Sequence, residues 1–431
     1  MPRARICPPT WAAALSVAVV VARAGGARAE VLSEDALAGT SREAGVVLRS
    51  YAFMLGGAVL RPPLATEDTS PLGVGVSDLR FYFVETRPRF KLVLHAPLTA
   101  TISSDTAPGN TLLQGVPPPR WLPLRARLAD RDRFQVIAEV DWLYLAWQSG
   151  PVTVTVGRQP ISLGRAKVWR PEDLLAGFSL TEVDTEYKRG VDAFRLDWSI
   201  GEQSTVRLFA SPGEIQIDRD VEASRTGSAA LLQMVLGGAG GELGAILGWV
   251  RGDLVAGIDG AVPVGSFDVH AEATATRLTD DSLPAPGFAS GDVRGKAAVG
   301  MTLHPSPTLI LGPELLYNGF GTAKIGDRPD LVGSPRIPLG EQTTLGVLYC
   351  AATGEWKPSS MWTIGGLALF NTTDQSALLS LSVRTSIASN ANAEIGGYLP
   401  VGRPPDAETG EPVTEYGLYP GFLYFKLKVV L

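Results

Sequence analysis

Charged side chains crowd the stretch between residues 158 and 189, around Trp169 and Phe178. Pro160 and Pro171 restrict the backbone within this stretch. Charges of both signs, held around a narrow opening, focus the electric field on a small solute. The chemistry that these residue types favour is therefore electrostatic selection. The charged members include Arg158, Arg165, Lys167, Arg170, Glu172, Asp173, Asp184, Glu186, Lys188 and Arg189.

The same charges fit two simpler arrangements, and both stay open at the level of sequence. An exposed loop would merely solvate them, since surface ion pairs contribute little. Alternatively, Arg158, Asp173 and Asp192 would pair only to hold this stretch against a neighbouring strand.

Side chains for catalysis are few. His270 and Glu272 would share one face of a strand near Ser266 and Asp268, an arrangement that a hydrolase could use. No nucleophile signature accompanies them, so we predict no enzyme, no cofactor and no metal site. Beyond residue 29 the histidines are His95, His270 and His304.

The N-terminal residues have the pattern of a secretory leader. Arg3 and Arg5 precede an apolar run from Trp11 to Ala22, and small residues at 27–29 fit a cleavage site. We predict a signal peptide over 1–29, which would take Cys7 with it and leave Cys350 without an intrachain partner. Because 1–29 carries four arginines and no acid, its removal moves the net charge from −6 to −10. Such an acidic chain is not expected to bind nucleic acid.

The elements that must position the charges are strands. No window beyond the leader offers about 18 consecutive apolar residues, so a helical membrane protein is excluded. Between 135 and 144, Val136, Ala138, Val140, Trp142 and Tyr144 are predicted on one face, and Gln135, Glu139 and Asp141 on the other. After a turn at 149–151 the alternation resumes, and it recurs at 194–208, where Arg195, Asp197 and Arg207 take the polar face. One face suits lipid and the other water, as in a membrane β-barrel.

The spacing of the strands supports a barrel, because tight turns alternate with long connections. The long connections include 103–132 and 159–189, and Asp259-Gly260 reads as a two-residue hairpin turn. We predict an all-β, transmembrane antiparallel barrel of about 18 strands, with 16 left open, whose short turns and termini lie in the periplasm. The expected strands are 46–60, 79–84, 90–102, two within 133–158, two within 190–211, 228–237, 242–250, 253–259, 264–277, 293–304, 307–318, 342–353, 359–371, 374–387, 390–401 and 415–431.

Three segments carry a family resemblance. They are Val156-Gly157-Arg158-Gln159-Pro160-Ile161-Ser162-Leu163-Gly164, Trp169-Arg170-Pro171-Glu172-Asp173-Leu174 and Arg189-Gly190-Val191-Asp192-Ala193. Together they resemble porin-type barrels of Gram-negative outer membranes, particularly the alginate-export-like group. The resemblance covers residues 130–200 and implies a channel of about 16 to 18 strands. It implies no substrate, because the arginine-lined tunnel of alginate exporters has no residue-by-residue match here.

These inferences place a periplasmic segment at 30–45 and the barrel at 46–431 of an outer-membrane protein. We predict passive diffusion of small hydrophilic solutes, with a preference for anions as a hypothesis, because basic residues slightly outnumber acidic ones on the strands. A non-conducting barrel, plugged by its loops, with a structural, adhesive or assembly role is the alternative, and a soluble secreted β protein is a third. Outer-membrane lipid is the expected surrounding, and monomer and homotrimer stay open. The predicted lumen residues are Arg80, Lys91, Glu139, Asp141, Arg195, Asp197, Arg207, Glu272, Lys296, Arg384, Lys426 and Lys428.

Overall fold

The computed structural model describes residues 40–56, 72–104, 117–179, 182–216, 224–238, 240–327 and 329–431. The predicted signal peptide lies outside the described residues. The strands of the main sheet are β1 (Ser41–Gly56), β2 (Leu72–Arg87), β3 (Phe90–Ser103), β4 (Arg125–Arg131), β5 (Phe134–Glu139), β6 (Trp142–Ser149), β7 (Val152–Gln159), β8 (Val191–Ile200), β9 (Ser204–Ser211), β12 (Ala229–Gly238), β13 (Gly241–Val250), β14 (Asp253–Val264), β15 (Phe267–Arg277), β16 (Val293–Ser306), β17 (Leu309–Asn318), β18 (Leu348–Ser359), β19 (Trp362–Asn371), β20 (Ser376–Ala388), β21 (Ala391–Val401) and β22 (Gly421–Val430).

The sheet closes on itself. Neighbours in sequence pair antiparallel along the chain, β9 pairs with β12, and β22 pairs with β1 through ten residue pairs. Of the 20 strands, β5 and β6 follow one another along the same edge of β3, and β4 pairs only with β5. Counting β5 and β6 as one and leaving out β4 gives 20 − 2 = 18 strands around the ring. The predicted closed antiparallel barrel is confirmed.

Small elements lie outside the ring. β10 (Glu214–Gln216) and β11 (Ser224–Thr226) form a separate two-stranded ribbon in the β9–β12 connection. Three short 3-10 turns, η1 (Ile325–Asp327), η2 (Pro329–Leu331) and η3 (Tyr416–Leu418), lie in the connections before β18 and β22. Among the described residues no helix is long and apolar enough to cross a bilayer.

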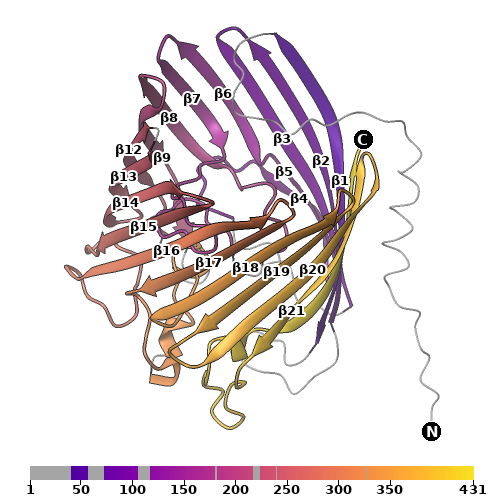
Figure 1. The fold of residues 1–431 in the computed structure, drawn as a ribbon, viewed down its shortest axis with the longest axis vertical. Coiled ribbons are helices and arrows are strands. Elements are labelled where there is room, and N and C mark those ends of the chain that lie inside the picture. The colour runs from indigo at the N-terminus through magenta and orange to yellow at the C-terminus, as the bar shows by residue number, and fades with distance from the viewer. Residues whose placement is uncertain are drawn as a thin grey trace.

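Most of the tight turns lie at one end of the barrel. They join β2 to β3, β6 to β7, β12 to β13 and β16 to β17, whereas β7 to β8 and β17 to β18 are joined by long connections at the other end. Figure 1 shows the strands wrapped around an interior that non-strand segments cross, with the C-terminus at the end of the tight turns. β1 begins at Ser41, within the 30–45 segment expected to precede the barrel.

The polarity of the two faces follows the alternation of side chains along each strand. In β14, Leu254, Ile258 and Val262 are exposed on the outer wall, while Asp253 and Asp259 are buried toward the interior. Exposed leucine, valine and aromatic side chains recur on the outside of nearly every strand. An apolar outer wall around a polar interior, with every strand edge of the ring paired, is the construction of a membrane-spanning barrel.

Two sequence predictions were wrong in detail. Asp259 and Gly260 are not a turn, because β14 continues through them and turns at Gly265 and Ser266; Asp259 belongs to the polar inner face instead. The predicted outward face of Trp142 and Tyr144 is also wrong. Pairing with β3 slips between β5 and β6, where His95 pairs with Trp142 but Leu98 with Ala138, so the bulge reverses the alternation.

Strand bounds differ elsewhere. The predicted long segment 103–132 contains β4, and the strand expected over 342–353 runs from Leu348 to Ser359. Before Leu348 the chain is held by side chains instead of a strand ladder: Asn318, at the end of β17, donates to the Thr344 hydroxyl, and Glu415 accepts the N–H of Leu345.

Candidate functional site

The segment of residues 160–190, which we call the constriction loop, leaves the wall after β7 and enters the interior. Two carboxylates of the wall capture its backbone. Glu272 of β15 accepts N–H groups from Arg165 (2.6 Å) and Ala166 (2.8 Å), and Glu314 of β17 accepts those of Lys167 and Trp169 (both 2.8 Å). Hydrogen bonds from several backbone N–H groups to one carboxylate are charge-assisted and fix the position of the loop.

Apolar packing reinforces this half of the constriction loop. Ile161, Leu163, Leu174 and Leu175 are buried against inward side chains of the wall, among them Leu231 and Ile246. The Arg165 side chain adds an ion pair to Asp259 (Nε to Oδ2, 2.6 Å) and another to Glu242. The N-terminal half of the loop is thus fastened to β12–β17.

The C-terminal half reaches a different part of the wall. Asp184 pairs with Arg49 of β1 and accepts a hydrogen bond from Tyr51 (2.7 Å), and Lys426 of β22 lies 3.8 Å away. The guanidinium of Arg49 lies over the ring of Tyr187, 4.6 Å from the ring centroid, which is a cation–π distance. Burial disfavours the ionised form of Asp184, but Arg49 and then Lys426 outweigh it and hold the pKa of this carboxyl below its usual value. The loop therefore spans the interior from one wall to the other.

Arg158 lies where the constriction loop leaves β7. Its side chain is 1% exposed and forms a forked contact with Asp192 of β8 (2.7 and 3.0 Å). Oδ2 of Asp192, which takes the second of these contacts, also accepts the N–H groups of Trp121 and Leu122. Asp173 forms its ion pair with Lys188 instead (2.6 Å), so the two halves of the loop are also tied to each other.

A second connection folds inward beside the first. Arg336, in the β17–β18 connection, pairs with Asp253 (2.6 Å) and with Glu341 (2.9 Å). Arg251 bonds both Glu341 (2.5 Å) and the carbonyl of Leu175 in the constriction loop (3.1 Å). Burial opposes the charge of Glu341, but Arg251 and Arg336 keep its pKa below the ordinary value. One arginine therefore links the two inward connections.

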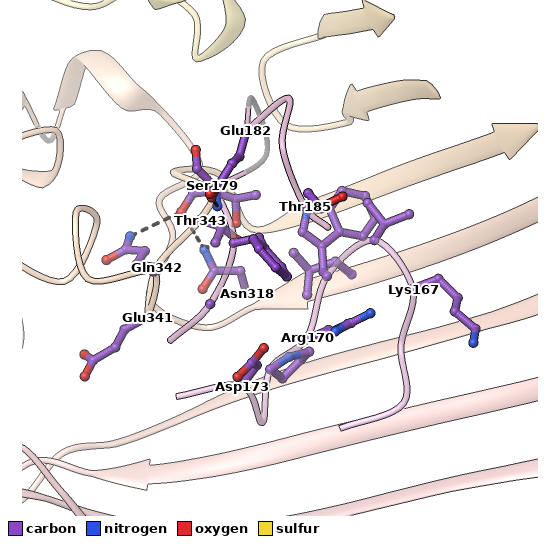
Figure 2. A pocket seen from close by; sticks show the side chains of 18 of the residues that line it. Lys167, Arg170, Asp173, Ser179, Glu182, Thr185, Asn318, Glu341, Gln342 and Thr343 are labelled. Carbon is purple, nitrogen blue, oxygen red and sulfur yellow. Dashed lines mark hydrogen bonds between the residues drawn. The ribbon is translucent and has the colours of Figure 1, made fainter. Parts of the chain in front are cut away.

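A cavity of about 440 Å³ remains between these connections and the wall from β16 to β21. Figure 2 shows Arg170 and Asp173 of the constriction loop on one side, with Glu341 and Gln342 of the second connection near them. Among its lining residues are Lys167, Trp169, Arg170, Asp173, Phe178, Glu182, Thr185, Lys296, Asn318, Glu341, Gln342 and Tyr398. The lining combines charged and polar side chains with aromatic and aliphatic ones.

The charges of this lining are unequally matched. Asp173 is paired with Lys188, Glu182 with Arg189, and Glu341 with two arginines. Lys167 and Arg170 are exposed, and neither has an acidic partner within ion-pair distance among the residues that the structure describes. The side chain of Arg170 makes one hydrogen bond, to the carbonyl of Ala166 (3.0 Å).

A second cavity, of about 310 Å³, shares Val183 and Thr185 with the first. It lies toward the tight-turn end, where Lys428 pairs with Glu186, and Arg384 with Glu394 (2.8 Å). The two cavities follow one side of the interior, past the C-terminal half of the constriction loop.

The remaining predicted residues lie on the inner wall and are mostly paired. Glu139 and Asp141 both bind Arg120, and Asp141 also binds Arg80 at 3.0 Å. Asp197 lies between Arg195 (2.7 Å) and Arg207 (3.0 Å). None of these five predicted residues lines the two cavities. Of the residues predicted from the sequence, Lys167, Arg170, Asp173 and Lys296 line the first cavity, and Glu186, Arg384, Lys426 and Lys428 line the second.

Sequence reasoning missed Glu314, Arg336 and Glu341. The alternation in β17 could have revealed Glu314, which shares a face with Asn318 while Leu315 and Tyr317 take the other. Arg336 and Glu341 lie in an irregular connection, where the sequence has no periodic pattern that would predict an inward side chain. His270, the residue considered for hydrolysis, contacts Glu314 through Nε2 at 3.1 Å. In the described part of the chain no group of three or more His, Cys, Asp or Glu is placed to hold a metal ion.

No protein-family model and no curated protein sequence matches the chain. Solved structures do match. OccAB3 of Acinetobacter baumannii has a TM-score of 0.55 at 10% identity, covering 90% of this chain and 99% of that one. OpdK of Pseudomonas aeruginosa, solved with vanillate, has 0.51 at 9%, covering 90% and 98%. The outer membrane protein OprD of the same organism has 0.50 at 10%, covering 90% and 92%.

The chain has the fold of the outer-membrane porins. At these identities the likeness concerns the fold alone. It agrees with the porin-type resemblance expected from the sequence.

Proposed function

We propose that this protein is an outer-membrane channel for the passive diffusion of small hydrophilic solutes, with a preference for anions. The observation that carries the proposal is the cavity between the constriction loop and β16–β21, in which Lys167 and Arg170 are unpaired while the acids are neutralised. Unpaired cations in a narrow polar passage attract anions and repel cations.

The comparisons support the same class of function. The proteins that share the fold include the outer membrane protein OprD and OpdK, whose structure was solved with vanillate, an aromatic carboxylate. Trp169, Phe178 and Tyr398 line the cavity near the two cations, so a small organic anion with an apolar part would find contacts of both kinds. The finer grouping with alginate-export-like barrels stays a prediction that rests on the three sequence segments. Outer-membrane lipid would surround the barrel, and a monomer and a homotrimer are both compatible with the proposal.

The test is single-channel recording in a planar lipid bilayer with a salt gradient. We expect discrete ohmic steps and a reversal potential of the sign for anion selectivity. The double variant Lys167→Gln/Arg170→Gln removes the unpaired cations, and its reversal potential should move toward zero or change sign. Arg42→Gln/Arg87→Gln, on the exposed tight-turn end of the outer wall, is the matched control and should leave selectivity unchanged. Cation selectivity of the wild-type protein would overturn the anion preference.

A plugged, non-conducting barrel is the second candidate, because the constriction loop is fastened to opposite walls. Silence in the bilayer from protein that remains folded, as judged by its heat-modifiable migration in gels, would favour the plug. A structural or assembly role would then replace transport.

A further inference from the structure

The side chain of Glu172 is a buried carboxyl of the constriction loop without hydrogen-bond partners. Glu172 is 0% exposed, and neither Oε1 nor Oε2 has a hydrogen-bond partner in the described structure. Its own backbone N–H donates to Glu272 (3.1 Å), which fixes the residue against β15. Buried acceptors without donors are rare in folded proteins, so this group calls for a physical explanation.

The wall facing Glu172 also contains a buried carboxylate oxygen without a hydrogen-bond partner. Asp259 of β14 binds Arg165 through Oδ2, but its Oδ1 is buried without a partner. Space for the Glu172 carboxyl exists because β14 has a glycine beside it. A Cβ atom on Gly257 would lie 2.6 Å from Oε1 of Glu172. The Glu172 carboxyl therefore packs closely against β14, beside Asp259, whose Oδ1 has no hydrogen-bond partner.

We propose that Glu172 is a positioning residue that carries a proton in the folded channel and donates its O–H to Oδ1 of Asp259. The shared proton fastens the constriction loop to β14. A neutral carboxyl has one donor, which satisfies the spare oxygen of Asp259 and removes the like-charge repulsion between the two acids. This inference rests on the proposed channel function only in its consequence for current.

The charges around Glu172 agree with a protonated state. Asp259 comes from β14, Glu272 from β15, Glu242 from β13, Lys296 from β16 and Arg165 from the loop itself. Burial is the largest influence, and Asp259 and Glu272 add to it, raising the pKa of Glu172 to about 9 against the opposing effect of Arg165. The geometry and the surrounding charges thus favour the same protonation state.

The sign of the pH effect follows from this. Once the loop leaves the wall, Glu172 regains the ordinary pKa of a glutamate, near 4.5. The docked position is most favoured below that value, where both states hold the proton. Between pH 4.5 and about 9 the released loop loses its proton first, so the ratio of released to docked loop rises by up to tenfold per pH unit. Raising the pH should therefore loosen the constriction.

The direct test is infrared difference spectroscopy of the refolded full-length protein. We expect a carboxylic C=O stretching band at pH 7 in the wild type that is missing in Glu172→Gln and unchanged in Glu408→Gln, a control at an exposed carboxyl of the β21–β22 connection. If the spectra of wild type and Glu172→Gln differ only in the carboxylate region at pH 7, Glu172 is ionised and the proposal is wrong.

Current recordings add a functional measurement. A purely structural role of Glu172 would not change how the current depends on pH. Transitions between current levels should become more frequent in the wild type from pH 5 to pH 9, whereas Glu172→Gln, which is permanently neutral, should show a flat profile. A wild-type-like pH profile in Glu172→Gln would overturn the assignment. If Glu172→Gln does not fold, Asp259→Asn replaces it, because an amide donor at 259 should remove the C=O band by favouring ionised Glu172. A protein that shows the band but no current would retain the shared proton and lose the proposed channel function.

Discussion

Most charged side chains inside this barrel are committed to one another, and this limits what they can do for a solute. Arg158 and Asp192, chosen from the sequence as part of a charged stretch, are 1% and 3% exposed. Their contact supports the structural role that the sequence left open, in which this pair holds the loop against the wall. Arg251 and Asp253, the ends of an Arg-Gly-Asp tripeptide, are equally buried and bind Glu341 and Arg336. The tripeptide is thus a tight β13–β14 turn, and it is not available as an adhesion motif.

The buried pair makes a prediction about stability. Arg158→Met leaves Asp192 without its cation in a buried site, which should lower the free energy of unfolding by about 3–5 kcal/mol. The measurement is a denaturant titration of the protein folded in lipid vesicles. Arg42→Met, which breaks an exposed pair with Glu85, is the control and should change stability much less, because water and salt screen an exposed ion pair. Equal losses in the two variants would show that burial does not strengthen the Arg158 contact.

Among the elements, the strands and tight turns could be predicted from sequence because their signals are local. Alternating polarity and turn residues located 18 strands, including the hairpin through Gly150 and the glycine-rich turn before Gly241. The errors arose where a distant partner decides the outcome. The slip that turns Trp142 inward exists only in the pairing with β3, and Asp259 reads as a turn residue until Arg165 of the loop is placed beside it.

The path of the constriction loop could not be predicted for the same reason. Its anchors, Glu272 and Glu314, lie more than 100 residues away in the chain. The charged residues of the loop could be identified from the sequence, and Lys167, Arg170 and Asp173 do line the main cavity. Contacts with distant residues decide which of these charged side chains remain without an ion-pair partner. The spacing of residues within the loop does not reveal those contacts.

The constriction loop as an element makes its own prediction. Replacing residues 162–188 by a short Gly-Ser linker removes both its anchors and its unpaired cations, so single-channel conductance should rise and anion selectivity should fall. Replacing residues 405–411, an exposed part of the β21–β22 connection, by the same linker is the control and should change neither quantity. Unchanged conductance in the first variant would place the limiting constriction elsewhere, and the second inward connection, through Arg336 and Glu341, would be the next to remove.

At the scale of the whole molecule, the outer wall distinguishes a membrane barrel from a soluble β protein. A soluble protein would place its large apolar side chains in a core, whereas here they are exposed on the outside of the ring, as Ile258 is at 63%. In the described part of the chain, the strands of the closed ring are paired on both sides, so the wall that they form can face lipid.

Charge placed on this wall should therefore be costly in proportion to depth. Ile258 lies in the middle of β14 and Val264 at its end beside a tight turn, and both side chains are exposed on the outer face. In lipid vesicles, Ile258→Arg should lower the free energy of unfolding by about 2–4 kcal/mol and Val264→Arg by about 0–1 kcal/mol, because an arginine near the bilayer midplane is far from water while one at the interface reaches it. In water, exposed positions tolerate arginine with changes of about 0.5 kcal/mol or less, so a soluble protein would show no such difference. Two small and equal effects would mean that lipid does not cover this wall, and the membrane barrel would have to be given up together with the channel.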